Sequence, residues 1–272
     1  MINLNNILTM KDFYDRNGYF SPLKIYNAEE ANSFRSKLEN SEKKIGKLHY
    51  IVKTYTIMKW VYEIATNKIL LDFVEEIIGK NILLYNATFI IKEPNTKTHV
   101  SWHQDLTYWG FDDNEKQVSA WLALSKADEV SGCMQMIPGS HKNGFFEHYS
   151  TEDKNNVLLR GQTVSGIDLS KSKSCPLAPG EASFHHGLTL HSSKPNNSND
   201  RRIGLNFQYM TPEMKQLKNK NDSAICVRGE DKFHNFKIDK IAKTDFDYTA
   251  YGNLLDLNKQ YIQTQNKKQI LN

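Results

Sequence analysis

The segment Trp102-His103-Gln104-Asp105 places an imidazole and a carboxylate two residues apart. If residues 100–106 form a strand, His103 and Asp105 project from the same face, because side chains alternate with a period of two. A neutral imidazole and a carboxylate on one face can take adjacent positions on a divalent metal. A second histidine then completes the two-histidine, one-carboxylate set of non-haem Fe(II) oxygenases. By itself the pair also fits a hydrogen-bonded contact at a strand end.

Three histidines further along the chain are candidates for the second imidazole ligand: His185, His186 and His191. They follow a Pro-Gly turn and a predicted strand over residues 181–186, and His191 opens the next strand region. We expect His185 and His186 to be strand residues near the site, one pointing inward and one outward. Either of them remains an alternative ligand to His191.

An arginine occupies a notable position, because Arg202 lies eleven residues beyond His191 in a chain with six arginines among 35 basic residues. A guanidinium can bind a carboxylate through two parallel hydrogen bonds, which a lysine does poorly. The arrangement therefore indicates a binding site for a carboxylate close to the predicted metal site.

Taken together, these motifs resemble the phytanoyl-CoA dioxygenase (PhyH) family of Fe(II)/2-oxoglutarate-dependent oxygenases. The resemblance covers residues 86–210. It implies that His103, Asp105 and His191 bind iron, and that Arg202 holds the distal carboxylate of 2-oxoglutarate. Ser193 is a further candidate for a hydrogen bond to the cosubstrate, although a serine there equally fits a turn. Three segments carry the resemblance: SWHQDLTYWG at 101–110, SAWLALSKADEVSGCMQMIPGSHK at 119–142 and HHGLTLHSSKPNNSNDRRIGLNFQYM at 185–210.

The activity implied by the resemblance is hydroxylation of a small polar metabolite or natural product, using dioxygen and 2-oxoglutarate and releasing succinate and CO2. The carboxylate of Asp105 argues against halogenation, because family halogenases have Gly or Ala at that position. An organophosphonate such as an aminoethylphosphonate is an alternative substrate, and desaturation, epoxidation or cyclisation would use the same ligands. Two other classes remain open, a zinc hydrolase and a non-catalytic cupin-like binding protein. Neither of them needs an arginine at position 202.

The elements that must position these residues change in character along the chain. Residues 27–79 show helical periodicity, with Asn27 as an expected N-cap and Gly79 as an expected stop. From residue 81 onward the pattern is one of short strands between turn clusters, with a short amphipathic helix expected from Asn253. Strands are expected at residues 81–93, 100–106, 118–124, 133–137, 181–186 and 203–209.

These elements predict a mostly β fold with flanking helices around a double-stranded β-helix, or jelly-roll, core. We expect a single domain over residues 1–272, with a mainly helical part at 1–80, the jelly-roll core at 81–212 and a C-terminal extension at 213–272. The loop at 145–163 is expected to form part of a lid.

Composition excludes several classes of protein. The net charge of +4 and the pI of about 8.7 are too mild to indicate nucleic-acid binding. The N-terminal residues carry early charges and lack the apolar run of a secretory signal. The three cysteines form no CxxC pair and indicate neither a zinc knuckle nor a disulfide framework. We therefore expect a cytoplasmic protein whose partner is a small molecule, not a membrane or a nucleic acid, and whose oligomeric state is open.

Overall fold

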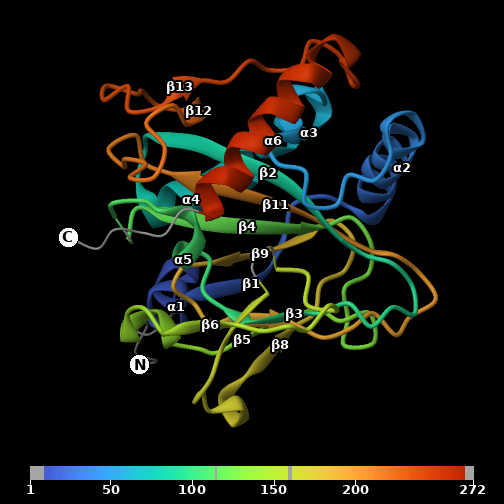
Figure 1. Cartoon of the computed structure of the whole chain (residues 1–272), viewed down its shortest axis with the longest axis vertical. Helices are drawn as coiled ribbons and strands as arrows, with labels where there is room; N and C mark the ends of the chain where they lie inside the picture. The colour runs from blue at the N-terminus through green and yellow to red at the C-terminus, as the bar shows by residue number, and fades with distance from the viewer. Residues whose placement is uncertain (1–8, 114, 159–160, 267–272) are drawn as a thin grey trace, which may run out of the picture.

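The computed structural model describes residues 9–113, 115–158 and 161–266. Within them, the strands form a seven-stranded sheet and a four-stranded sheet, with a further two-stranded hairpin (Figure 1). The larger sheet runs β1 (Tyr19–Lys24), β9 (Glu181–His185), β4 (Gln117–Ala123), β11 (Arg202–Met210), β2 (Ile82–Lys92), β12 (Ser223–Arg228) and β13 (Lys237–Ile238). The smaller sheet runs β3 (Val100–His103), β10 (His191–Ser193), β5 (Met134–Met136) and β8 (Lys173–Cys175), and the hairpin pairs β6 (His148–Ser150) with β7 (Gln162–Val164).

Six α-helices accompany these strands in the described residues: α1 (Met10–Asn17), α2 (Ala28–Ile45), α3 (Lys59–Ala65), α4 (Lys68–Ile78), α5 (Leu106–Trp109) and α6 (Tyr251–Asn266). The expected start of α2 is confirmed, because the Asn27 side chain accepts from the Glu30 N–H at 2.9 Å and the Glu30 carboxylate accepts from the Asn27 N–H at 2.8 Å. The expected stop at Gly79 is also confirmed, since α4 ends there with φ 92°.

The two faces of β11 have different environments. Its odd-numbered positions from Ile203 to Tyr209 are buried in the main hydrophobic core, where they meet side chains of α3 and α4 such as Trp60 and Phe73. Burying a large apolar side chain contributes about 1.5–3 kcal/mol, so this face anchors the helices to the sheet. The even-numbered positions point to the other side, toward the smaller sheet. That side contains the cavity described below.

The predicted strands are confirmed with shifts of one or two residues at their ends, except at residues 100–106. There the strand β3 stops at His103, and the helix α5 begins at Leu106. The large sheet also extends beyond the predicted core at 81–212: the mainly helical N-terminal part contributes β1, and the C-terminal extension contributes β12 and β13. Sequence reasoning missed β1 because its pattern, YFSPLK, contains a proline and lacks strict alternation of apolar and polar residues.

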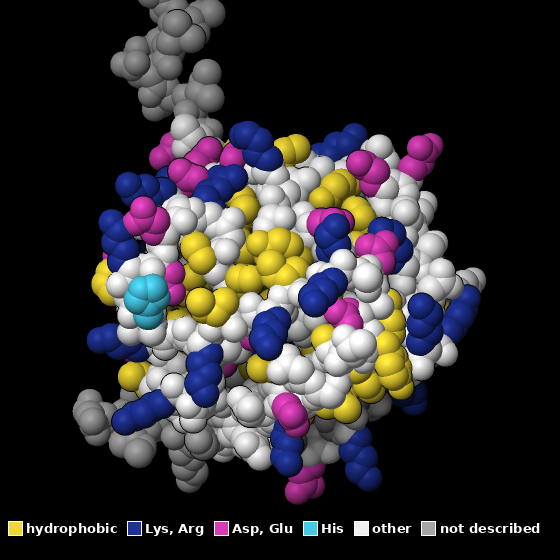
Figure 2. Space-filling model, turned by 90° about the horizontal axis from the view of Figure 1, so that it is seen from above, with side chains coloured by type: hydrophobic (Ala, Val, Ile, Leu, Met, Phe, Trp, Pro, Cys, Tyr) yellow, Lys and Arg dark blue, Asp and Glu magenta, His cyan; other side chains and the backbone are white. Residues whose placement is uncertain are grey.

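In Figure 1 the helix α6 passes in front of β2 and β11, with α3 next to its upper part. Figure 2 views the molecule from above and shows hydrophobic side chains gathered at the centre of this face, with basic and acidic side chains scattered around them. Among the described residues, no helix is both long enough and apolar enough to cross a membrane.

Candidate metal and cosubstrate site

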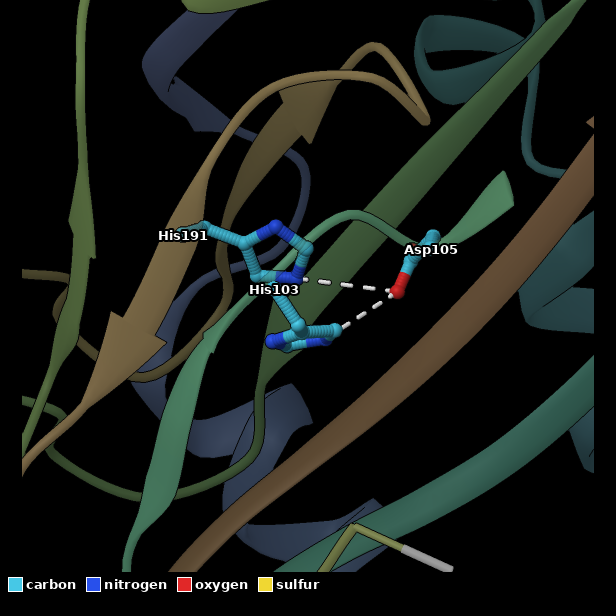
Figure 3. A group of neighbouring side chains, drawn as sticks. All are labelled: His103, Asp105 and His191. Carbon is cyan, nitrogen blue, oxygen red and sulfur yellow. Dashed lines mark ion pairs between the residues drawn. The ribbon is translucent and has the colours of Figure 1, made fainter. Parts of the chain in front are cut away.

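Three side chains from neighbouring strands meet at one point: His103 ends β3, Asp105 follows it, and His191 opens β10 (Figure 3). The backbones of His103 and His191 are paired directly across the two strands. The Asp105 Oδ1 atom lies 3.4 Å from His103 Nε2 and 3.6 Å from His191 Nε2. The potential ligand atoms of these three residues, called the metal triad below, all lie within 4.8 Å of one another.

The hydrogen bonds of both imidazoles fix which nitrogen is free. His103 Nδ1 donates to the Ser101 carbonyl at 2.9 Å, and His191 Nδ1 donates to the Thr189 carbonyl at 2.9 Å. Because a carbonyl can only accept, each Nδ1 carries the proton and each Nε2 carries a lone pair directed at the meeting point. Burial also lowers the pKa of His191, which keeps its ring neutral. This is the donor set that a divalent metal requires, so the residues fit a metal ion.

Two hydrogen bonds to the Oδ2 atom of Asp105 orient its carboxylate. Its Oδ2 atom accepts hydrogen bonds from His185 Nε2 at 3.2 Å and from Ser119 Oγ at 3.1 Å, which leaves Oδ1 toward the two ligand imidazoles. Burial acts to raise the pKa of Asp105, but the nearby His191, His103 and His185 side chains outweigh it and hold that pKa well below its usual range. Asp105 is therefore ionised, and its Oδ1 atom points at the centre of the metal triad.

Two expectations for this region need adjustment. His103 and Asp105 do converge, but not through strand alternation: Asp105 lies beyond β3 with φ −59° and ψ −42°, in helical conformation at the start of α5. The two alternative ligands, His185 and His186, are not part of the metal triad. His185 is hydrogen bonded to Asp105 Oδ2. His186 lies 3.5 Å from the exposed Glu115 carboxylate instead, so the two neighbouring histidines point to opposite sides as expected.

Arg202 begins β11 and is 3% exposed. Its Nε atom donates to the Gly132 carbonyl and its Nη2 atom to Ser193 Oγ, both at 3.3 Å, while Nη1 is buried without a partner. The guanidinium lies over the Trp121 ring at 4.9 Å, and burial lowers its pKa to about 10. No carboxylate of the described residues forms an ion pair with it. A buried arginine with an unpaired donor is suited to an anionic ligand.

The close approach of the Trp121 indole requires a glycine on the adjacent strand. A Cβ atom on Gly204 would lie 1.8 Å from this ring, so any side chain there would displace the indole that faces Arg202. Trp121 lies within the strand predicted at residues 118–124. The structure adds that Trp121 also lines the cavity.

Lys92 is a second buried basic side chain at this point, and sequence reasoning missed it. Its Nζ atom donates to Ser193 Oγ at 2.7 Å, to the Ser193 carbonyl at 3.1 Å and to the Lys194 carbonyl. Burial, followed by the charge of Arg202, lowers the pKa of Lys92 to about 6. Since the Ser193 hydroxyl oxygen accepts from both Lys92 and Arg202, its own proton is available to a further acceptor.

Tyr50 is another residue of the site without a signal in the sequence. It adopts φ 59°, a left-handed conformation that is unfavourable for a residue with a bulky side chain. Burial raises the pKa of Tyr50, as does the Asp105 carboxylate, whereas Arg202 acts in the opposite direction. The phenol is therefore within electrostatic range of both the metal triad and Arg202.

One cavity of about 140 Å³ connects these groups. Its lining includes the metal triad, Arg202 and Ser193, and it continues past Asn206 and Gln208 to side chains of α6. From the expected lid at 145–163, Leu158 lines the cavity, and residues 159–160 lie outside the described residues. The two-histidine, one-carboxylate cluster and the buried arginine thus line a single cavity.

Comparison with protein families gives a match over residues 14–204 to the family model described as phytanoyl-CoA dioxygenase (PhyH). A peroxisomal phytanoyl-CoA dioxygenase from Bos taurus is 24% identical over 233 residues, covering 75% of this chain and 69% of that protein. A probable alpha-ketoglutarate-dependent hypophosphite dioxygenase from Stutzerimonas stutzeri is 26% identical over 194 residues, covering 71% of this chain and 64% of that protein. The chain thus spans about two thirds of the length of these relatives.

Solved structures with the same fold include the non-heme monooxygenase ThoJ, with a TM-score of 0.83 at 22% identity over 94% of this chain and 98% of ThoJ. CytC3 with Fe(II) and alpha-ketoglutarate gives a TM-score of 0.63 at 20% identity over 88% of this chain and 94% of CytC3. These matches confirm the predicted jelly-roll class of fold, and the family match confirms the predicted family.

Proposed function

Because this chain belongs to the phytanoyl-CoA dioxygenase (PhyH) family of 2-oxoglutarate-dependent non-haem iron dioxygenases, we propose that it hydroxylates a small polar metabolite or natural product. Dioxygen and 2-oxoglutarate are consumed in this reaction, and succinate and CO2 are released. One observation carries the proposal: the metal triad and a buried arginine without an ion-pair partner among the described residues line the same cavity.

His103, Asp105 and His191 are assigned as the residues that hold iron. When bound, Fe(II) supplies the redox chemistry that couples oxidative decarboxylation of 2-oxoglutarate to oxidation of a substrate carbon. The chain's own contribution is to present two imidazole lone pairs and one carboxylate oxygen. A metal held by these three residues would keep coordination positions for cosubstrate and dioxygen. Asp105 fills the position that a halide would need, which supports hydroxylation over halogenation.

Arg202 and Ser193 are assigned to the cosubstrate. The unpaired Nη1 of Arg202 can donate to the distal carboxylate of 2-oxoglutarate, and the Ser193 hydroxyl can donate its free proton to the same group. Lys92 holds Ser193 in place through its hydroxyl and carbonyl oxygens. The positive charge of Arg202 is then balanced by the bound cosubstrate.

The lining favours a neutral or weakly charged substrate over a phosphonate. Among the described residues that line the cavity, Arg202 is the one lysine or arginine, and 2-oxoglutarate engages it. A phosphonate or hypophosphite substrate would meet no second lysine or arginine among the described residues of the lining, although one relative is named for hypophosphite. The zinc-hydrolase and cupin-like alternatives give no role to a buried arginine that faces the metal triad.

Anaerobic addition of Fe(II) and 2-oxoglutarate tests the proposal. A weak visible charge-transfer band is expected in the wild-type protein, because iron and chelated cosubstrate must be present together to produce it. Asp105→Ala is expected to lower Fe(II) affinity by about 100-fold or more and to abolish the band at micromolar iron. Absence of the band in the wild type, or iron binding unaffected in Asp105→Ala, contradicts the oxygenase assignment.

Succinate release in air, measured with amino acids, betaines and phosphonates, then identifies the substrate class. Stimulation by phosphonates alone would replace the proposed substrate class with the alternative one. Product mass distinguishes hydroxylation, which adds one oxygen atom, from desaturation or cyclisation, which removes two hydrogens.

The single-domain organisation and the cytoplasmic location remain predictions from the sequence. The small-molecule partner agrees with the family, whereas the compartment, the expected lack of nucleic-acid binding and the oligomeric state need direct measurement. Cell fractionation with an antibody against the chain tests the compartment.

A further inference from the structure

The part of the cavity away from Arg202 contains buried polar atoms that have no hydrogen-bond partner. They are Asn206 Oδ1, Gln208 Oε1, Thr88 Oγ1 and both terminal atoms of the Gln265 amide. All four side chains line the cavity. An unpaired buried polar group is unfavourable, so such a concentration of them in one cavity points to a missing ligand.

Strand geometry separates these atoms from the cosubstrate. Arg202, Asn206 and Gln208 lie on the same face of β11, and Asn206 and Gln208 are paired with Thr88 and Asn86 of β2. At about 3.4 Å per residue, Asn206 lies roughly 14 Å and Gln208 roughly 20 Å along the strand from Arg202. The two carboxylate carbons of 2-oxoglutarate are separated by only about 5–6 Å. A cosubstrate held by Arg202 therefore cannot satisfy the polar atoms at Gln208.

The helix α6 contributes Gln265 to this part of the cavity. Gln265 lies one turn after Tyr261, so both side chains project from the same side of the helix. Tyr261 is hydrogen bonded to Gln208, and the Asp105 carboxylate contributes to raising the pKa of Tyr261 after burial. This side of α6 therefore lies over the end of β11 and close to the metal triad. Gln265 itself is 1% exposed.

Helix packing alone does not explain Gln265. A leucine or methionine would fill the same space without burying an amide. Whichever way the Gln265 amide is turned, it presents one NH2 donor group and one carbonyl acceptor, and neither has a partner. The group that complements it must offer both an acceptor and a donor.

The chemistry of the neighbouring atoms narrows that group further. Asn206, Gln208 and Gln265 are uncharged and present three acceptor oxygens together with the Gln265 NH2 donor. A carboxylate would face these oxygens without a cation, and an ammonium group would leave the Gln265 donor unpaired. A carboxamide offers two N–H donors and one acceptor, which matches the atoms available.

We infer that Gln265, with Gln208 and Asn206, forms an uncharged subsite that binds a carboxamide group of the substrate. This inference rests on the proposed function, because the subsite occupies the same cavity as the metal triad. The amide belongs to a small molecule or to a peptide bond, and the two sources share an N–H donor and a carbonyl acceptor, although a peptide bond offers one N–H in place of two.

Binding of matched ligand pairs tests the inference. The full chain is loaded with redox-inert Zn(II) and 2-oxoglutarate, and calorimetry compares glutamine with glutamate, asparagine with aspartate and nicotinamide with nicotinate. N-acetylalanine N-methylamide serves as the peptide-bond probe. At least one amide is expected to bind about 10-fold or more tightly than the carboxylates, and the peptide-bond probe shows which source is preferred.

Substitutions on α6 assign the effect to Gln265. Gln265→Leu is expected to weaken binding of the preferred amide by about 10-fold or more. Gln265→Glu, which keeps the size of the side chain but removes its N–H donor, is expected to weaken binding to the same extent. The exposed Gln263, two residues earlier on the same helix, is the matched control, and Gln263→Leu is expected to keep wild-type affinity. If Gln265→Leu does not fold, Gln265→Glu decides the test.

Three results would overturn the inference: no amide of the set binds, the carboxylates bind as tightly as the amides, or the Gln265 and Gln263 variants behave alike. The charge-transfer band with Fe(II) and 2-oxoglutarate, measured on the same preparations, separates this failure from failure of the proposed function. A normal charge-transfer band together with no preference for amides contradicts the proposed subsite alone. Absence of the band contradicts the oxygenase assignment.

Discussion

The cavity has a charged part, formed by the metal triad and Arg202, and an uncharged part, formed by Asn206, Gln208 and Gln265. All four residues of the charged part lie inside the segment that matches the family model, residues 14–204, and all three of the uncharged part lie beyond it. The strand β11 therefore contributes to both parts, whereas the uncharged part also draws on α6, far beyond the segment that matches the family model.

The two parts are also built differently. In the charged part, each side chain is fixed by hydrogen bonds to neighbouring strands and loops, such as His103 to Ser101 and Arg202 to Gly132. In the uncharged part, Gln265 has no partner and depends on a helix that is attached to the body through contacts such as the buried Leu254. The first part is therefore preorganised for its ligands, and the second awaits a ligand to complete its hydrogen bonds.

The largest expected difference between the two parts is seen with adjacent arginines. Arg202→Ala is expected to weaken binding of 2-oxoglutarate by about 100-fold, because the charge-assisted hydrogen bond from Nη1 is lost. Arg201→Ala is the matched control, since Arg201 points outward to Glu42 at 2.9 Å and Glu93 at 3.1 Å. Titration of the charge-transfer band with 2-oxoglutarate measures both. Equal losses in the two variants would remove Arg202 from its assigned role.

The charged part should also make stability depend on pH through His49, whose Nδ1 accepts from the Ile91 N–H at 2.9 Å. Burial, with Arg202 adding to it, lowers the pKa of His49 to about 4. Between about pH 6.5 and 4 the unfolded chain therefore binds a proton that the folded chain does not. The stability contributed by neutral His49 is present above pH 6.5 and falls by about 3 kcal/mol as the pH drops to 4.

Urea unfolding at pH 7 and pH 4.5 measures this effect. His49→Asn is expected to reduce the pH dependence without abolishing it, because burial also lowers the pKa of His186 to about 4. His234→Asn is the control, since His234 is exposed. A pH dependence in His49→Asn as steep as that of the wild type would show that His49 is not its source.

A smaller effect is expected where a side chain acts on the triad through Asp105. His185→Asn removes one of the two donors to Asp105 Oδ2 and is expected to weaken Zn(II) or Ni(II) binding by about 10-fold. Ser119→Ala removes the other donor, and calorimetry with each metal tests both variants. Metal affinity unchanged in both would mean that the triad orients itself without this support.

The smallest effect is expected at the contact between the two segments that form the uncharged part. Tyr261→Phe removes the hydrogen bond to Gln208 and is expected to lower the free energy of unfolding by about 1 kcal/mol, or the melting temperature by about 2–4 °C. Calorimetry of the unliganded protein measures this change. A melting temperature equal to that of the wild type would show that this contact does not hold α6 in place.

Sequence patterns predicted much of the charged part. The H-x-D spacing, a distal histidine at a strand start and an arginine eleven residues later identified residues that the structure brings together. The strands carrying them were recognisable because one apolar face recurs with a period of two, as in the odd positions of β11. The same periodicity also contained an unused signal, since Asn206 and Gln208 interrupt an otherwise apolar strand on the face of Arg202.

Other residues of the cavity had no such signal. Tyr50 and Gln265 come from a left-handed turn and a C-terminal helix, and no short-range pattern relates them to the metal motif. The same holds for Lys92, which ends a long strand and contacts Ser193 of the lining. Periodicity and spacing report local geometry, because they follow from the backbone repeat of one element. Which side chains from distant elements share a cavity depends on how the sheets and helices pack. The sequence by itself therefore determined the strands and the metal-binding motif, and only the tertiary structure decided what surrounds the metal triad and where the uncharged subsite lies.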